Sequence, residues 1–186
     1  MSKTVVVPLA QGFEEIEAVT IIDVLRRAGI KVITVGLDEE NIVEGAHGIS
    51  LKIDVNIKEI NTKLVDMIIL PGGAGGTSIL ATNDNVQNMI KEIYKDGKLI
   101  GAICAAPYAL DKAGVLKGEY VCYPSFEDKI NNKNLNTLED VVISDHIITS
   151  KGPATAMCFA LEIVKILCGE VVFANVKNKL LAKHCL

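Results

Sequence analysis

The sequence lacks the features that mark several classes of protein. It contains no run of about 18 or more apolar residues, so we expect no membrane-spanning helix. Its first residues, MSKTVVVPLA, lead directly into a short β-branched run and lack the parts of a signal peptide. The net charge of −4 provides no basic face for a nucleic acid or an anionic membrane. We therefore expect a cytoplasmic protein with neither partner.

Cysteine and histidine are present, but their spacing is typical of neither a disulfide framework nor a metal site. The number of cysteines, 5, is odd and no two follow a C-x-x-C pattern, so we expect no disulfide framework. The 3 histidines do not pair with them at metal-ligand spacing, so we expect no metal site. The cysteines other than Cys104 are interpreted as packing residues, with exposure possible for Cys185. They are Cys122, Cys158, Cys168 and Cys185.

Length and composition favour one globular domain over residues 1–186. Hydrophobic residues make up 49% of the chain and charged residues 23%, which is ordinary for a folded domain of this size. The pattern predicts short apolar strands that alternate with helices. The expected strands are Thr4–Leu9, Lys31–Val35, Asp66–Leu70, Lys98–Ile103, a brief one at Tyr120–Cys122, one or two within Val141–Ser150, and a hairpin at Ile42–Ile53. The expected helices are Glu14–Ala28, Asn83–Lys95, Ala105–Ala113, Thr155–Leu167 and a tail from Val171.

Continuously apolar strands separated by helices indicate a mainly parallel sheet that is covered on both faces. In such α/β folds, ligands bind at the carboxyl ends of the strands. The unusual residues of this sequence fall at those ends: Gln11-Gly12, Pro71-Gly72-Gly73 and Cys104 each follow a predicted strand.

Cys104 has two interpretations. It stands between a strand and a helix in GAICAAP, among small residues that a sharp strand-to-helix turn requires, as in a nucleophile elbow. A helix amino terminus beside the sulfur would lower the pKa of the thiol. Alternatively, Cys104 is a small buried hydrophobe, since free cysteine is among the most buried residue types.

Two further elements are candidates for the same site. The LPGGAGG segment, Leu70–Gly76, is either a plain turn or a loop whose Gly73 amide forms an oxyanion hole with the amide of Ala105. Glu17 lies in a helical stripe with Phe13, Ile21 and Val24, where a carboxyl group would lose solvation and gain a higher pKa. The alternative is a partly solvated glutamate in an acidic first turn.

A histidine base cannot be placed from spacing. His47 falls in a predicted turn and His146 beside a strand. The sequence spacing places neither histidine next to Cys104. A thiol and a carboxyl group are therefore the pair that the pattern favours.

Five short motifs resemble the ThiJ/PfpI superfamily, in its DJ-1-like branch. They are GFEEIEA (12–18), DVLRRAGIKV (23–32), ILPGGAGG (69–76), AICAAP (102–107) and TSKGPATA (149–156). The resemblance covers nearly the whole chain. It implies a flavodoxin-like three-layer sandwich with a mainly parallel central sheet and a nucleophile elbow.

The resemblance also implies roles for individual residues. Cys104 matches the nucleophile and Glu17 its acidic partner, while Gly73 and Ala105 match the oxyanion hole. The residues matching the pocket are Gly72, Arg27, Tyr123 and Pro153. Tyr123 stands where some members have a histidine, so no Cys–His dyad is implied. Members are usually homodimers built through the first helix, on which Val19, Ile22 and Leu25 extend the apolar surface.

The implied function is a cysteine-dependent, cofactor-free glyoxalase or deglycase. Its substrates would be 2-oxoaldehydes such as methylglyoxal and the early glycation adducts of proteins and amino acids. The alternative is an oxidative-stress sensor or redox-regulated chaperone that uses the same cysteine. An intracellular peptidase or amidase ranks lower, because Ala105 occupies the position where those relatives carry a histidine.

Overall fold

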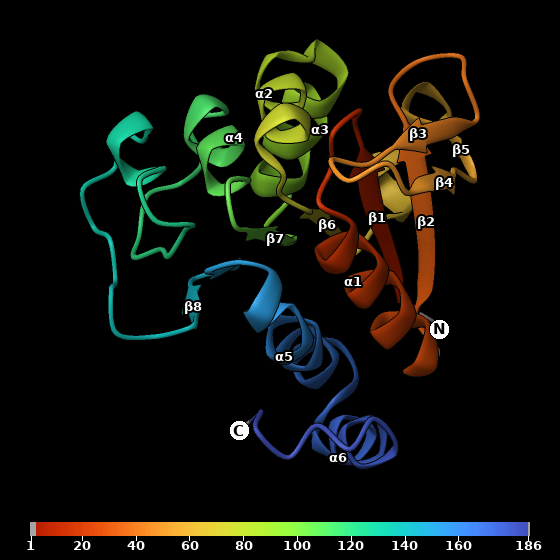
Figure 1. The fold of residues 1–186 in the computed structure, drawn as a ribbon, viewed down its shortest axis with the longest axis vertical. Helices are drawn as coiled ribbons and strands as arrows, with labels where there is room; N and C mark the ends of the chain where they lie inside the picture. The colour runs from red at the N-terminus through yellow and green to blue at the C-terminus, as the bar shows by residue number, and fades with distance from the viewer. Residues whose placement is uncertain (1–2, 186) are drawn as a thin grey trace.

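The computed structural model describes residues 3–185, which form a central sheet with helices on both faces (Figure 1). The strands of this sheet are β1 (Thr4–Leu9), β2 (Lys31–Gly36), β5 (Val55–Asn56), β6 (Met67–Leu70), β7 (Leu99–Ile103), β8 (Val141–Ser144) and β9 (Ile147–Ser150). Their order is β5-β2-β1-β6-β7-β9-β8, and every pair is parallel except β8 with β9. The expected flavodoxin-like α/β fold is confirmed.

Two helical layers enclose the sheet (Figure 1). One face packs against α1 (Glu15–Arg27), α5 (Ala156–Cys168) and α6 (Glu170–Lys179). The other packs against α2 (Ala74–Thr82), α3 (Asp84–Lys95) and α4 (Pro107–Lys112). A hairpin of β3 (Ile42–Glu44) and β4 (Ser50–Lys52) lies beside α1, as expected from the sequence. Short 3-10 turns occupy Ile57–Glu59, Thr62–Leu64, Glu127–Lys129 and Pro153–Thr155.

The strands form where the sequence is continuously apolar because both of their faces are covered. All four residues of β6 are buried, and four of the five residues of β7 are as well. The strand order reverses around β1, since β2 lies on one side of it and β6 on the other. The loops after β1 and β6 therefore diverge at a topological switch point, where α/β folds place their ligands.

Three local predictions were wrong in ways that have physical causes. LPGGAGG is not only a turn, because α2 begins at Ala74 and includes Gly75 and Gly76, which pack against the backbone of Gly12 and Phe13. The helix after Cys104 begins at Pro107 rather than Ala105, because the first two alanines form the turn itself. Tyr120–Cys122 forms no strand beyond a single bridge between Tyr120 and Leu135.

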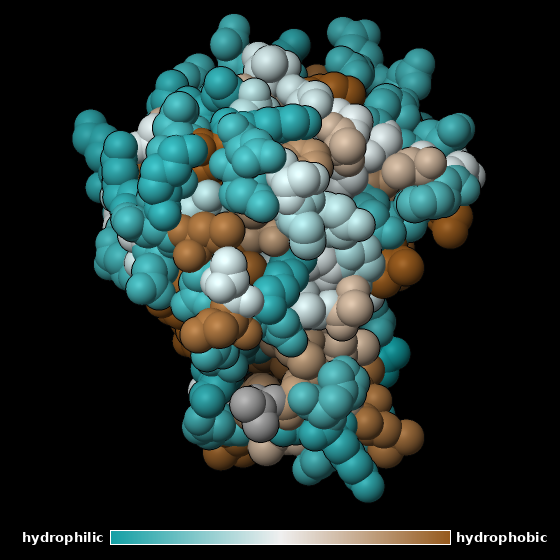
Figure 2. Space-filling model, turned by 60° about the vertical axis from the view of Figure 1, so that its left-hand side comes forward, coloured by the Kyte–Doolittle hydropathy of each residue, from teal (hydrophilic) through white to brown (hydrophobic). Residues whose placement is uncertain are grey.

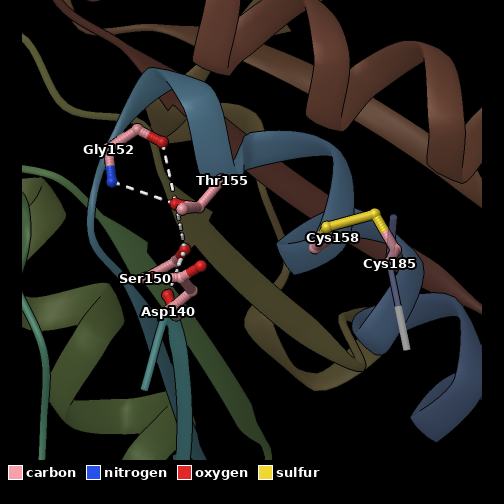
Figure 3. Close-up of a disulfide and its surroundings, with 6 residues drawn as sticks. All are labelled: Asp140, Ser150, Gly152, Thr155, Cys158 and Cys185. Carbon is pink, nitrogen blue, oxygen red and sulfur yellow. Dashed lines mark hydrogen bonds between the residues drawn. A yellow bond between two sulfur atoms is a disulfide. The ribbon is translucent and has the colours of Figure 1, made fainter. Parts of the chain in front are cut away.

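The carboxy-terminal cysteines also differ from expectation. Cys158 of α5 and Cys185 are joined in a disulfide, although their separation of 27 residues follows no recognisable motif. Cys185 is buried rather than exposed. Chain folding brings the pair together, because α6 turns back beside α5 and returns the terminal segment to the start of that helix (Figures 1 and 3).

The surface shows one further property of the fold. Figure 2 shows a face on which hydrophilic residues predominate and hydrophobic residues lie in separate patches. Within the described part of the chain, no helix has both the length and the apolar character that crossing a membrane requires.

Phe159 provides a test of the packing between α5 and the sheet. Its side chain is fully buried, and its ring lies against Gly101 of β7, where an added Cβ would stand 3.1 Å from it. Phe159→Ala is expected to lower the free energy of unfolding by about 3–5 kcal/mol. Leu138→Ala is the control, because Leu138 is 87% exposed and its loss is expected to change stability by less than about 0.5 kcal/mol. Urea titrations would measure both, and equal stabilities would contradict the packing described.

Candidate active site

Cys104 occupies a strained turn at the carboxyl end of β7. Its φ of +62° places a residue with a side chain in the left-handed region, which costs on the order of 1–3 kcal/mol. The turn is held on both sides, because the Cys104 N–H donates to the carbonyl of Ser150 at 2.9 Å and its carbonyl accepts from the Tyr123 N–H at 2.8 Å. The side chain is 8% exposed, so the thiol is largely but not fully enclosed. This is the geometry of a nucleophile elbow.

Glu17 reaches the same point from the first turns of α1. Its side chain has no exposed surface, and its Oε2 accepts a hydrogen bond from the Gly72 N–H at 2.7 Å. Its Oε1 is buried with no conventional hydrogen-bond partner among the described residues. The Cys104 thiol is the side chain that interacts with this carboxyl group.

Gly72 makes the approach of thiol and carboxyl possible. A Cβ at this position would lie 2.6 Å from the Cβ of Cys104 and 2.7 Å from Oε2 of Glu17. Any side chain would therefore occupy the space that these two groups share. The glycine after β6 is required here for close approach and not for a turn.

Gly73 and Ala105 direct their backbone amides at the Cys104 sulfur. Gly73 has a φ of +89°, and a Cβ there would stand 2.3 Å from the carbonyl oxygen of Gly12. The loop after β1 thus presses against the loop after β6 and fixes the direction of the Gly73 amide. The structure brings together Cys104, Glu17, Gly73 and Ala105, as the sequence predicts. Such a pair of amides can stabilise negative charge on sulfur or on an adjacent oxygen.

The electrostatics of the pair differ in part from the prediction. Burial raises the pKa of the Glu17 carboxyl from 4.5 to about 7, as expected for its apolar surroundings. Burial also raises the pKa of the Cys104 thiol, and the negative charge of Glu17 adds to the effect, giving about 12. The opposing amides of Gly73 and Ala105 do not compensate. The expected lowering of the Cys104 pKa is therefore wrong for a thiol that faces an ionised Glu17.

The protonation of Glu17 changes how strongly the Cys104 thiolate is opposed. When Glu17 is protonated, its charge no longer opposes a thiolate, and the carboxylic acid becomes a hydrogen-bond donor. The two amides then favour the anionic sulfur, while burial continues to oppose it. The two groups consequently titrate as one unit, with apparent pKa values that belong to the pair.

The remaining predicted pocket residues fall into two groups. Tyr123 is about half exposed, and its ring lies next to Gly152, where an added Cβ would stand 3.2 Å from it. Gly152 directly precedes Pro153, so Tyr123 and Pro153 flank the elbow together. Arg27 is not brought to the site: it lies in the last turn of α1, ten residues or about 15 Å along the helix from Glu17, and pairs with Asp23 at 2.7 Å.

Glu15 and His47 form a contact that sequence spacing did not indicate. The Glu15 carboxylate accepts from the His47 backbone N–H at 2.6 Å and lies 3.0 Å from His47 Nδ1. Burial alone would raise the pKa of Glu15, but these hydrogen bonds and one from Ile49 lower it to about 2. The two residues are 32 positions apart and meet because the hairpin closes over the start of α1, so no sequence motif could reveal them.

Potential metal ligands gather at two places in the described chain, and neither includes Cys104. One is Glu14, Glu15 and His47, and the other is Cys158, His184 and Cys185. A pocket of about 680 Å³ lies farther away, lined by Thr4, Lys31 and Asp66 near the amino ends of their strands. The strands are parallel there, so this pocket lies at the amino ends of the strands, whereas the elbow lies at their carboxyl ends.

The comparisons with known proteins agree with this architecture. Residues 3–166 match the DJ-1/PfpI family. The glutathione-independent glyoxalase DJR-1.2 of Caenorhabditis elegans is 41% identical over 174 residues, covering 93% of this chain and 90% of that protein. The crystal structure of Drosophila melanogaster DJ-1beta has a TM-score of 0.93 at 38% identity, covering 97% of this chain and 98% of that one. Oxidised DJ-1 of Toxoplasma gondii has a TM-score of 0.92 at 36% identity, covering 97% of this chain and 98% of that one.

The raised pKa of Glu17 predicts a specific pH dependence of stability. A carboxyl group with a pKa of about 7 in the folded chain and 4.5 otherwise stabilises the fold fully below pH 4.5, and this contribution is lost as the pH rises through 7. Relative to wild type, Glu17→Gln is therefore expected to gain stability from acidic to alkaline pH, by up to about 3 kcal/mol. Urea unfolding at about pH 5 and about pH 8 measures the difference.

Glu15→Gln is the matched control for this titration. Because the pKa of Glu15 is lowered, its contribution is present at neutral pH and lost only in strong acid, so the variant is expected to be less stable than wild type at both pH values. A Glu17→Gln variant whose stability ran parallel to wild type would contradict the raised pKa.

Gly72 and Gly75 provide a test of the close approach. Gly72→Ala is expected to lower the free energy of unfolding by about 1–3 kcal/mol, because the new Cβ overlaps Cys104 and Glu17. Gly75→Ala is the control, since its nearest neighbours would stand 3.7 Å away and alanine favours helix α2. Equal stabilities in chemical denaturation would show that the carboxyl and thiol are not packed around Gly72.

Proposed function

This chain belongs to the DJ-1/PfpI family, and we propose that it converts 2-oxoaldehydes such as methylglyoxal into 2-hydroxy acids with Cys104 and Glu17 and without a cofactor. The observation that carries the proposal is the buried pair of thiol and carboxyl beneath the amides of Gly73 and Ala105. The name of the 41% identical relative, a glutathione-independent glyoxalase, supports the reaction class. Early glycation adducts of proteins and amino acids are the second proposed substrate class.

The first step is addition of sulfur to the aldehyde carbon. The Cys104 thiolate attacks this carbon and forms a hemithioacetal, in which the former carbonyl oxygen carries the negative charge. The amides of Gly73 and Ala105 already converge on the sulfur, so an oxygen bound to the adjacent carbon lies within their reach. The protonated form of Glu17 favours this step, because it removes the charge that opposes the thiolate. Glu17 then gives its proton to the hemithioacetal oxygen and becomes a carboxylate.

The second step moves a proton between the two carbons of the substrate. The Glu17 carboxylate takes the proton from the former aldehyde carbon, and the electron pair forms an enediolate. The hydroxyl proton passes to the neighbouring oxygen, and Glu17 returns its proton to the neighbouring carbon, which gives the thioester. Oε2 of Glu17 is held by the Gly72 N–H, while Oε1 has no conventional partner among the described residues. We therefore assign the proton transfer to Oε1. A pKa of about 7 suits a group that must both accept and donate a proton near neutral pH.

The third step releases the product. The rearranged intermediate is a thioester of Cys104, and water attacks its carbonyl carbon to give the 2-hydroxy acid and the free thiol. One water is consumed for each methylglyoxal, and lactate is the product. No electron leaves the site, which is why the reaction requires neither an oxidant nor a reductant.

The same site supports a second function, that of an oxidative-stress sensor or redox-regulated chaperone. The observation that favours it is the structural likeness to an oxidised DJ-1. A sulfinic acid at Cys104 would lie between the amides of Gly73 and Ala105 and could accept a hydrogen bond from protonated Glu17. Intact mass after mild peroxide treatment distinguishes the roles: two added oxygens on Cys104 support a sensor, and no oxidation of that residue contradicts it. Peptidase or amidase activity ranks lowest among the proposed functions, because Ala105 carries no basic side chain.

We also propose a homodimer that forms through α1. Ile16 and Val19 are 59% and 44% exposed on that helix, and Ile49 of the adjoining hairpin turn is 55% exposed. These side chains form an apolar surface beside the start of α1, and covering it in a dimer would remove them from water. Leu25 does not contribute, because it is fully buried against the sheet, and Ile22 is only partly exposed.

The enzymatic proposal predicts the behaviour of three variants with methylglyoxal in metal-free buffer without glutathione. Cys104→Ser is expected to form no detectable lactate, and Glu17→Gln to lose about 10²–10⁴ in kcat because it cannot move the proton. Cys168→Ser is the control, since Cys168 lies on α5 and is expected to keep the wild-type rate. A Cys104→Ser protein that consumed methylglyoxal at the wild-type rate would falsify the mechanism.

The dimer proposal predicts a change in mass in solution. Val19→Arg places a charge in the proposed interface and is expected to convert a two-chain species into single chains, as measured by light scattering. Leu138→Arg, at a position that is 87% exposed outside α1, is expected to leave the mass unchanged. Wild-type protein with the mass of one chain at micromolar concentration would refute the dimer.

A further inference from the structure

The carboxy-terminal segment brings a second group of reactive side chains together, separate from Cys104. Cys158 lies in the first turn of α5, and its disulfide partner Cys185 follows α6 near the end of the chain (Figure 3). His184 is adjacent to Cys185 in sequence. One ligand atom each from Cys158, His184 and Cys185 lies within 4.8 Å of the other two. Two sulfurs and an imidazole at such distances form a typical set of ligands for a zinc-like ion.

The surroundings of this group are acidic and open to solvent. The three side chains line a surface pocket of about 350 Å³ together with Glu139, Asp140 and Glu162. No lysine or arginine lines it, although Lys151 reaches Asp140 from outside at 2.9 Å. His184 itself is exposed, so the group is open to solvent on one side. The pocket therefore attracts cations and admits them.

The group has two mutually exclusive states. A disulfide holds its sulfurs about 2.05 Å apart, whereas two thiolates on one tetrahedral zinc ion, each at about 2.3 Å, stand about 3.8 Å apart. The metal-bound state thus requires reduced cysteines and a small separation of the two chain segments. Cys185 lies in the non-helical segment that follows α6, so this segment can supply that movement without disturbing α5.

We propose that the reduced chain binds one divalent ion of the zinc class through Cys158, Cys185 and His184, with a water as the fourth ligand. Glu162, one helical turn after Cys158, contributes charge to the wall of the pocket and is not a direct ligand. Oxidation of the two cysteines to the disulfide releases the ion.

The redox step requires a two-electron oxidant, which we take to be a peroxide. The two thiolates give up two electrons and form the sulfur–sulfur bond, the ion leaves, and the peroxide takes two protons and becomes two waters. A reductant such as a dithiol or a phosphine reverses the sulfur chemistry and restores the site. The disulfide in the structure is the oxidised state of this pair.

Metal binding to the full-length chain tests the proposal. Protein reduced with a phosphine is mixed with Zn²⁺ without oxygen, freed of loose metal by gel filtration, and analysed for bound zinc. We expect one zinc per chain in wild type, and Co²⁺ in its place is expected to show the charge-transfer absorption of a thiolate complex. Peroxide is expected to release the zinc as the disulfide forms. Cys158→Ser, Cys185→Ser and His184→Ala are each expected to weaken binding by at least about tenfold.

Three controls keep the result specific. Cys104→Ser, Cys168→Ser and Glu162→Gln are expected to retain the zinc, the last with a change of no more than a fewfold. His184→Ala leaves the cysteines in place, so it remains informative even where a cysteine variant folds poorly. Reduced wild type without bound zinc would overturn the proposal, and so would zinc binding that His184→Ala and both cysteine variants leave unchanged.

Discussion

The hydrogen bond from the Gly72 N–H to the Glu17 carboxyl joins two of the three chain segments that make the site. It ties the first turns of α1 to the loop after β6, at 2.7 Å, in a region from which water is excluded. Without a side chain at Gly72, the Cys104 turn can lie against the same carboxyl. The contact holds the Glu17 carboxyl beside the thiol and next to Gly73, whose amide faces the sulfur.

Two features of the site are energetically unfavourable: a strained backbone conformation and a buried carboxyl group. Cys104 adopts a left-handed conformation, and Glu17 is desolvated with only one of its oxygens conventionally hydrogen-bonded within the described chain. Both features oppose stability in isolation. The hydrogen bonds of Cys104 to Ser150 and Tyr123 and the close packing of Gly73 on Gly12 hold the strained turn in place. Such strain is expected where a fold is organised around a reactive group.

Much of the architecture could be predicted from the sequence because it follows from periodicity. Continuous apolar runs indicated the buried parallel strands, and the strand ends indicated where Gly73 and Cys104 would meet. The helical stripe around Glu17 indicated its burial. The effect of Glu17 on the Cys104 pKa could not be predicted, because it depends on a distance between two segments and not on either sequence alone. A helix amino terminus beside the sulfur predicts a lower pKa for Cys104, whereas burial and Glu17 raise it.

Contacts between residues far apart in the sequence could not be predicted either. Glu15 meets His47 across 32 positions, and Cys158 meets Cys185 across 27, with no motif linking either pair. Arg27 illustrates the opposite case. Its position matches a family motif, but its side chain pairs with Asp23 and does not reach the site within this chain. Helix α2 does not follow from the sequence pattern, because the four glycines of LPGGAGG suggest a turn, whereas two of them lie within α2 and pack against the loop after β1.

The central claim is that Glu17 and Cys104 form one proton-sharing pair. Carbon-13 NMR of the Glu17 carboxyl in labelled protein tests it most directly, with assignment by Glu17→Gln and a parallel titration of Cys104→Ser. We predict a Glu17 midpoint near 7 that shifts when Cys104 is replaced. A midpoint at the ordinary value of 4.5 that is indifferent to Cys104 would contradict the account.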